Sequence, residues 1–208
     1  MFDRTLTGRR ALLKSVAGFA AAATLPLIAR TALAQDPGAS AFIQKLGDRA
    51  IKTFSDKGTK AAAKEKFRAL LVEGFDIPYI GRWVLGRYWN VANDAQRQEY
   101  MALFERMIVD AYAGRFAEYS GETFKITGAR PEGDADSTVT TQIVRPSGPP
   151  INVDWRVRKA GATYKIIDVA VEGVSMGVTQ RSEFASVIQT NGGQFDGLLK
   201  VLRAKVAG

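Results

Sequence analysis

The hydrophobic pattern of the chain changes its period near Gly121, and no other feature of the sequence constrains the fold as strongly. Before this point apolar residues recur at helical spacing, and after it they alternate with polar residues as they do in strands. Helical spacing returns beyond Ser182. Helices followed by strands and then by helices predict an α+β fold, in which the helices gather on one face of a curved sheet.

Helices are expected on both sides of the strand-like region. The N-terminal ones should cover residues 36–56, 59–74, 79–86 and 93–120, and two short ones should follow Ser182, around Val187 and around Leu199. The longest has the clearest start, because Asn93 is a good N-cap residue and Gln96 stands three positions later, as in a capping box.

Four strands are expected, at residues 123–127, 137–144, 151–157 and 164–171. A proline-rich turn region separates the second strand from the third. Because the connections are short, neighbouring strands should pair as an antiparallel meander. The sequence therefore predicts N-terminal helices, a four-stranded, mainly antiparallel curved sheet and C-terminal helices.

The last of these strands, residues 164–171, is apolar over its second half, which is typical of a strand that is covered on both faces. We expect it near the centre of the fold. Gly173 and Gly177 then bracket a segment that should be irregular, although it carries Val174 and Met176. Irregular segments normally expose polar side chains, so other apolar groups should cover these two side chains.

The first 34 residues have the three parts of an export signal. Arg9 and Arg10 belong to a basic start, an apolar run covers residues 16–28, and residues 32–34 form a small-x-small cleavage site. The paired arginines approximate a twin-arginine signal, although Gly8 stands where a serine or threonine is usual, and the general secretory route stays open.

Removal of residues 1–34 would leave one domain, residues 35–208, in the periplasm. The apolar run of the signal is shorter than the ~20 residues that a membrane-spanning helix needs, which argues against a retained anchor. Since no cysteine follows the signal, a lipoprotein is excluded.

The chain contains neither cysteine nor histidine, and this excludes several kinds of site. Disulfides, thiolate nucleophiles, Ser-His-Asp triads and imidazole metal ligands are all impossible. The best remaining carboxylate pair, Asp168 and Glu172, would lie ~13 Å apart along a strand, too far to share one reacting bond. We therefore expect no catalytic residue, no metal and no cofactor.

The net charge gives no sign of a nucleic-acid partner. The formal charge is +8, but five of the 29 basic residues and one of the 21 acidic residues lie in the first 34 positions, which leaves +4 for the rest. No basic run with interleaved aromatic residues marks a nucleic-acid groove. Scattered charge of this kind is typical of a solvated surface.

Two sets of short motifs resemble those of a known family. The first set is Leu85-Gly86-Arg87-Tyr88-Trp89, then Gln96-Arg97 and the aromatic Tyr100, Phe104 and Tyr112. The second set is Asp168-Val169, residues 172–176, Arg181-Ser182-Glu183-Phe184 and Gly197-Leu198-Leu199. Both are similar to motifs of the MlaC, or toluene-tolerance auxiliary, family of periplasmic phospholipid carriers. The similarity extends in order over roughly residues 42–205.

The resemblance implies a protein that shuttles a diacyl glycerophospholipid between an outer-membrane lipoprotein complex and an inner-membrane ABC transporter complex, and that maintains outer-membrane lipid asymmetry. The acyl chains would lie in an apolar cavity between helices and sheet, with the headgroup near solvent. The phospholipid would be the cargo of a periplasmic monomer that is not an enzyme.

Carried over by position, Tyr112 on the long helix and Val174 after the last strand are expected to line this cavity, and Arg156 is a further candidate at its mouth. A guanidinium suits a lipid phosphate because it can donate two hydrogen bonds, although a wet strand face also explains this arginine. The other lipid-binding candidates are Val84, Leu85, Tyr88, Phe104, Ile108, Trp155, Val171 and Met176. Each of them could equally pack a solid core.

Three other functions stay open from the sequence. A wider and more aromatic cavity would favour a carrier of another lipid, such as a hopanoid. A tightly packed interior would favour an interaction module without a ligand. A hydrolase would have to use carboxylates alone.

Overall fold

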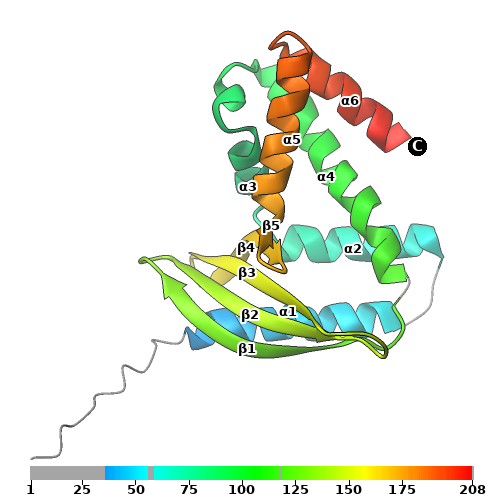
Figure 1. Cartoon of the computed structure of the whole chain (residues 1–208), viewed down its shortest axis with the longest axis vertical. Coiled ribbons are helices and arrows are strands. Elements are labelled where there is room, and N and C mark those ends of the chain that lie inside the picture. Colours follow the sequence, from blue (N-terminus) through cyan, green and yellow to red (C-terminus); the bar gives the residue numbers. More distant parts are fainter. Residues whose placement is uncertain (1–35, 56–58, 118, 208) are drawn as a thin grey trace, which may run out of the picture. The chain divides into compact units, whose positions relative to one another are not determined.

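Helices and strands follow one another in the order that the change of period predicts (Figure 1). The computed structural model describes residues 36–55, 59–117 and 119–207. Its elements are α1 (Pro37–Ser55), α2 (Lys60–Gly74), α3 (Ile77–Leu85), the 3-10 helix η1 (Gly86–Asn90), α4 (Asp94–Ala117), β1 (Thr123–Glu132), β2 (Asp136–Val144), β3 (Ile151–Ala160), β4 (Thr163–Val171), β5 (Val174–Ser175), α5 (Met176–Thr190) and α6 (Phe195–Ala207). The predicted α+β class is confirmed.

Side-chain caps fix the starts of several helices. Two of them begin earlier than expected: α3 at Ile77, two positions before the expected start, and α5 at Met176, before Ser182. The Asp76 carboxylate accepts a hydrogen bond from the Tyr79 N–H at 3.0 Å, at the start of α3. The capping box of α4 is present, because Asn93 Oδ1 accepts from the Gln96 N–H at 2.9 Å and Gln96 Oε1 accepts from the Asn93 N–H at 3.0 Å. These bonds satisfy N–H groups that have no partner inside the helix.

The strands form one antiparallel sheet in the order β1-β2-β3-β4-β5. Register shifts interrupt the β1/β2 pairing between Ile126 and Gly128 and the β3/β4 pairing between Arg156 and Val157. Such irregularities bend a strand and increase its twist, so they curve the sheet. The antiparallel meander is confirmed, with one strand more than the four expected.

The additional strand, β5, lies in the segment that was expected to be irregular. Glu172 and Gly173 both have positive φ, 48° and 79°, and form the two-residue turn that returns the chain onto β4. On this edge strand the side chain of Val174 is 55% exposed, so the expectation that apolar groups cover it was wrong. Met176 is half-buried at the start of α5.

β4 lies at the centre of the fold, as expected. It pairs with β3 and β5 and contacts α2, α3 and α5. Ile166 and Ile167 on this strand are both buried. The chain between α2 and α3 also reaches this strand, because the Asp76 N–H donates to the Ile166 carbonyl at 2.9 Å.

Buried apolar side chains form two clusters. The larger one holds α2, α3, α4, α5 and α6 together. It contains Tyr100 and Phe104, whose ring centres are 5.5 Å apart. The smaller one lies between α1 and the sheet and contains Ile43, Val157 and Ile166. Figure 1 shows α1 running along the sheet, and α2 lies beside α4, another helix of the larger cluster.

The predicted export signal, residues 1–34, and its cleavage site lie outside the described residues. The single domain at residues 35–208 therefore stays a prediction. Within the described ranges, no helix is both long enough and apolar enough to cross a membrane.

Candidate functional site

An apolar cavity of about 220 Å³ lies where the two hydrophobic clusters meet. The helices contribute Ile43, Leu46, Gly47, Ala50, Ile51 and Phe54 from α1 and Phe67, Leu70, Leu71 and Phe75 from α2 and its C-cap. Tyr119, Glu122, Thr123, Phe124, Thr141, Ile143 and Trp155 complete the wall. α1, α2 and the sheet therefore enclose the cavity together.

Helical spacing assembles the α1 wall. Ile43, Gly47, Ala50 and Phe54 stand three or four positions apart and so share one face of the helix. Two of these four residues, Gly47 and Ala50, are small and let groups of the sheet approach the helix closely. A side chain at Gly47 would collide with the ring of Phe124 on β1, so its absence lets this ring pack directly on the helix backbone.

Three polar groups in the cavity wall have partners within the protein. Trp155 Nε1 donates to Thr141 Oγ1 at 2.9 Å, and the Thr141 hydroxyl donates to the Val153 carbonyl at 3.2 Å. Glu122 accepts hydrogen bonds from the N–H and the hydroxyl of Ser120, and the backbone bond is the main reason why the pKa of its carboxyl group is lowered. This wall suits an apolar ligand, which offers no hydrogen bonds in exchange.

Trp155 is the one sequence-predicted candidate that lines this cavity, and the other nine apolar candidates lie elsewhere in the described chain. Val84, Leu85 and Phe104 are at most 2% exposed inside the helical cluster. Tyr88 and Ile108 are partly buried and pack against the same cluster. A role of these residues in lipid binding stays a prediction.

The structure brings two more candidates into contact. The Tyr112 hydroxyl lies 3.9 Å from the sulfur of Met176 and forms a hydrogen bond that links α4 to α5. Val171 and Val174 face each other across the turn between β4 and β5. Their contribution to a lipid site is likewise a prediction.

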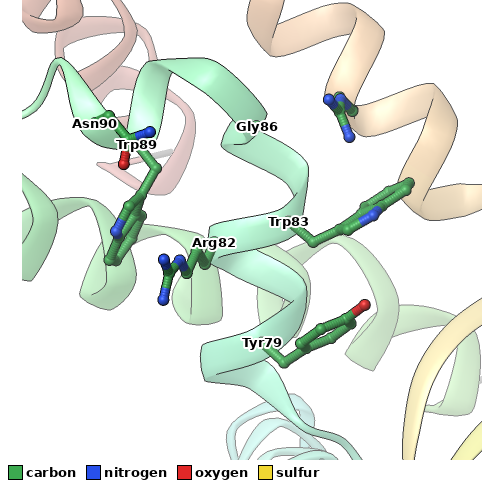
Figure 2. A pocket seen from close by; sticks show the side chains of 7 residues that line it. Tyr79, Arg82, Trp83, Gly86, Trp89 and Asn90 are labelled. Atoms are coloured by element: carbon green, nitrogen blue, oxygen red, sulfur yellow. The ribbon is translucent and has the colours of Figure 1, made fainter.

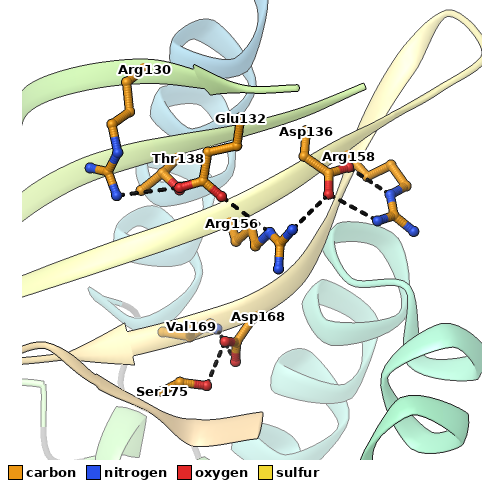
Figure 3. Close-up of polar contacts among 9 residues, drawn as sticks. All are labelled: Arg130, Glu132, Asp136, Thr138, Arg156, Arg158, Asp168, Val169 and Ser175. Carbon is orange, nitrogen blue, oxygen red and sulfur yellow. Dashed lines mark hydrogen bonds and ion pairs between the residues drawn. The ribbon is translucent and has the colours of Figure 1, made fainter. Parts of the chain in front are cut away.

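Arg156 belongs to a network of charged side chains on β1, β2 and β3 (Figure 3). Its guanidinium lies 3.1 Å from Asp136 and 3.3 Å from Glu132. Asp136 also accepts hydrogen bonds from Arg158 at 2.6 and 2.9 Å, and these bonds are the main cause that holds the pKa of its carboxyl group below the usual value. Arg156 thus has two carboxylate partners, and its contact with a headgroup stays a prediction.

Asp168 accepts hydrogen bonds inside the fold. The Ser175 hydroxyl donates to its carboxylate at 2.5 Å (Figure 3). The Gly177 N–H donates to the same carboxylate at 3.0 Å. Glu172 accepts from the Asn152 N–H at 2.6 Å. Both carboxylates therefore stabilise turns and helix starts. Among the described residues, no group of three or more potential ligands could hold a metal ion.

Sequence reasoning missed most of the cavity wall. Leu46, Phe54, Phe67 and Leu71 lie in the two N-terminal segments that were expected to be helical, but none of them was among the lipid-binding candidates. The available signal was the pair of small residues, Gly47 and Ala50, among large apolar ones on a single helix face. A face of this kind packs with a gap unless its partner fills the space.

The fold and the cavity define the class: an α+β protein in which two helices and a curved antiparallel sheet enclose an apolar cavity. Residues 44–204 match the sequence model of the family described as MlaC protein. Because the match covers well over half of the chain, the protein belongs to the MlaC family. The resemblance seen in the sequence is confirmed.

Two relatives are similar to this protein over most of its chain. Toluene tolerance protein ttg2D of Pseudomonas putida is 24% identical over 192 residues, which are 90% of this chain and 86% of that protein. The intermembrane phospholipid transport system binding protein MlaC of Haemophilus influenzae is 24% identical over 159 residues, with 72% and 74% covered.

A solved structure has the same fold. The phospholipid-binding protein from Ralstonia solanacearum, in complex with a phospholipid, superposes with a TM-score of 0.74 over 80% of this chain and 96% of that chain. The two sequences are 24% identical. The fold class predicted from the sequence is thereby supported independently.

Proposed function

We propose that the protein is a periplasmic carrier of a diacyl glycerophospholipid and that the apolar cavity takes the acyl chains. The observation that carries this proposal is the cavity between α1, α2 and the sheet, with its almost entirely apolar wall. Membership of the MlaC family and the phospholipids named for two relatives support the choice of cargo. A ligand-free interaction module would have no use for such a cavity.

The cavity would widen as the lipid enters. Its volume of about 220 Å³ is below the ~300–1,000 Å³ of pockets that hold drug-sized ligands, and a diacyl lipid is larger than most of these. We place the widening between α1 and β1, where the Phe124 ring packs on the bare backbone at Gly47. Rotation of one side chain there would free space without breaking backbone hydrogen bonds.

Transfer would occur by direct handover. Burial of ~30 methylene groups at ~0.8 kcal/mol each is worth about 24 kcal/mol relative to water. This exceeds the ~18–21 kcal/mol ceiling of reversible affinities, so the lipid would not leave into water on a useful timescale. Movement from a bilayer into the protein is nearly isoenergetic, because the methylene groups are buried in both places.

The carrier would therefore exchange its lipid only while docked. Its partners would be an outer-membrane lipoprotein complex and an inner-membrane ABC transporter complex, and the exchange would maintain the lipid asymmetry of the outer membrane. Such a carrier needs neither a catalytic residue nor a cofactor, since no covalent bond changes.

Native mass spectrometry of the protein from its own periplasm tests the cargo. We expect a mass excess that corresponds to one or two diacyl phospholipids, which extraction then identifies. A mass excess that corresponds to a hopanoid would show that the cargo is another class of lipid. Protein without any bound lipid, even after incubation with liposomes, would contradict the carrier function.

A cavity-filling variant tests the position of the acyl chains. Ala50→Phe adds a ring to the cavity wall on α1 and should lower the bound lipid several-fold, because less volume remains. Ala41→Phe places the same side chain on the exposed face of the same helix and should leave the lipid content unchanged. Equal lipid content in both variants, by native mass spectrometry, would place the acyl chains elsewhere.

A further inference from the structure

A second pocket, of about 250 Å³, is formed by α3, η1 and α5 (Figure 2). Two arginines and three aromatic residues dominate its wall: Arg82, Arg181, Tyr79, Trp83 and Trp89. The pocket shares no lining residue with the apolar cavity. Storage of acyl chains therefore does not explain it.

Aromatic rings, and not carboxylates, hold the two arginines. The Arg82 guanidinium lies 5.9 Å from the centre of the Trp89 ring, and that of Arg181 lies 5.2 Å from the centre of the Trp83 ring. Within the described ranges, neither guanidinium takes part in a hydrogen bond or an ion pair. Stacking fixes a guanidinium and leaves its N–H donors available at the edges.

The absence of a side chain at Gly86 leaves room for the Arg181 guanidinium. Gly86 has a φ of +53°, in the left-handed region that favours glycine, and a Cβ there would lie 2.7 Å from Nη2 of Arg181. The guanidinium can therefore lie against the backbone where α3 passes into η1. Arg181 on α5 thus adds a second positive charge to the pocket wall, besides that of Arg82 on α3.

Carboxylates near the pocket have other partners. Asp168 and the Trp83 ring both lie beside Gly177, but Asp168 accepts hydrogen bonds from Ser175 and Gly177, and Asp94 pairs with Arg97. Residues 77–92, which comprise α3 and η1, contain Arg82 and Arg87 but no aspartate or glutamate. On α5, Glu183 stands two positions after Arg181, a spacing at which helical side chains do not face each other, and it accepts a hydrogen bond from Gln180. A negatively charged partner would complement this surface.

Exposed apolar side chains extend the surface beyond the pocket. Val91 follows Asn90 at the rim and is 66% exposed, and Val178, one helical turn before Arg181, is 56% exposed. Tryptophan, tyrosine and arginine are the residues most enriched at the energetic centres of protein interfaces. A concave pocket also suits a protruding side chain better than the flat surface of a bilayer.

We propose that this pocket is the docking site for a protein partner that presents carboxylates beside an apolar side chain. The carboxylates would bind the free edges of Arg82 and Arg181. The apolar side chain would contact the tryptophan rings, and the exposed valines would extend the interface. This inference does not depend on the cargo, because the two pockets are built from separate residues.

Binding of the intact protein to envelope membranes of the source organism tests the proposal. We expect saturable binding that high salt weakens, that protease treatment of the membranes abolishes, and that is absent from vesicles made of the lipids extracted from the same membranes. The affinity of the double variant Arg82→Gln/Arg181→Gln should be lower by about tenfold or more. This is the loss expected when interface arginines are truncated.

A matched variant controls for net charge. Arg68→Gln/Arg203→Gln removes the same two charges from exposed arginines that pair with Glu105 and Glu99, and it should bind like the wild type. Equal binding of the two double variants, or no binding of the wild type, would overturn the proposal. Undiminished binding to the extracted-lipid vesicles would show that the pocket binds a lipid surface and not a protein partner.

Native mass spectrometry of the same samples separates docking from cargo. The Arg82→Gln/Arg181→Gln variant should carry as much lipid as the wild type, since the cavity wall is unchanged. Loss of membrane binding with retained lipid supports the docking site. Loss of both together would indicate a damaged fold and overturn the assignment of these arginines to docking alone.

Discussion

Among single residues, one carboxylate connects the sheet to the helices. Asp136 is 8% exposed and accepts hydrogen bonds from Arg156 and Arg158 (Figure 3). The Arg158 guanidinium also lies 4.5 Å from the centre of the Tyr79 ring on α3. A largely buried carboxylate with such partners stabilises the fold only while it is ionised.

Asp136→Asn should therefore lower the free energy of unfolding by about 2 kcal/mol at neutral pH, because two guanidinium groups lose their charged acceptor. The pKa of Asp136 is lowered in the folded protein, mainly by the Arg158 hydrogen bonds. The stabilisation is thus fully present above the pKa of the unfolded chain, about 3.9, and is lost as the pH falls through the lower folded value.

Urea unfolding at neutral pH, and in steps toward acid, measures this contribution. The difference between wild type and Asp136→Asn should shrink as the pH falls. Asp94→Asn is the control, because this carboxylate is 98% exposed in its pair with Arg97 and should change the free energy of unfolding by less than about 1 kcal/mol. A difference that does not vary with pH would contradict the electrostatic account.

Among the elements, α5 begins at a side-chain cap, Ser175, that also joins it to β4. The Ser175 hydroxyl accepts a hydrogen bond from the Val178 N–H at 3.0 Å and donates one to Asp168 at 2.5 Å. Asp168 in turn accepts from the Gly177 N–H. The end of β4 and the first turn of α5 are therefore held together by one serine and one aspartate, and this fixes the helix that carries Arg181.

Ser175→Ala should lower the free energy of unfolding by about 1–2 kcal/mol, since the helix loses its N-cap and Asp168 loses a donor. Chemical denaturation of the two proteins measures the difference. Ser186→Ala, at an exposed position of the same helix, should cost no more than about 0.5 kcal/mol. Equal effects of the two substitutions would show that the cap contributes nothing.

For the molecule as a whole, the cavity at the meeting point of the two clusters couples lipid binding to stability. A ligand that binds only the folded state stabilises it by mass action. An apolar chain in this cavity would contact α1, α2 and the sheet at once and so link the two clusters. The lipid-loaded protein should therefore unfold at a higher temperature than the delipidated one.

Delipidation should lower the thermal midpoint of the wild type and of Ala41→Phe alike. The thermal midpoint of Ala50→Phe should fall much less on delipidation, because this variant binds less lipid and its new ring fills part of the cavity. Differential scanning calorimetry before and after lipid extraction measures these shifts. An equal drop in all three proteins would contradict the coupling of the cavity to stability.

The sequence determined the features that depend on near neighbours along the chain. The change of period near Gly121 established the order of helices and strands, because side chains three or four positions apart share a helix face and alternate ones share a strand face. Asn93 and Gln96 marked the start of α4 for the same local reason. The motifs around Tyr88 and Asp168 were sufficient to identify the family.

Only the tertiary structure decided which residues surround the cavity and which partners the charged groups have. The cavity is the space left when α1 and α2 pack on the sheet. Phe124 packs on Gly47 there, although the two residues are 77 positions apart and no local pattern predicts their contact. Arg156 has carboxylate partners because strand register places Asp136 beside it. A local pattern shows that a side chain is apolar or charged, whereas what it touches depends on how distant elements pack.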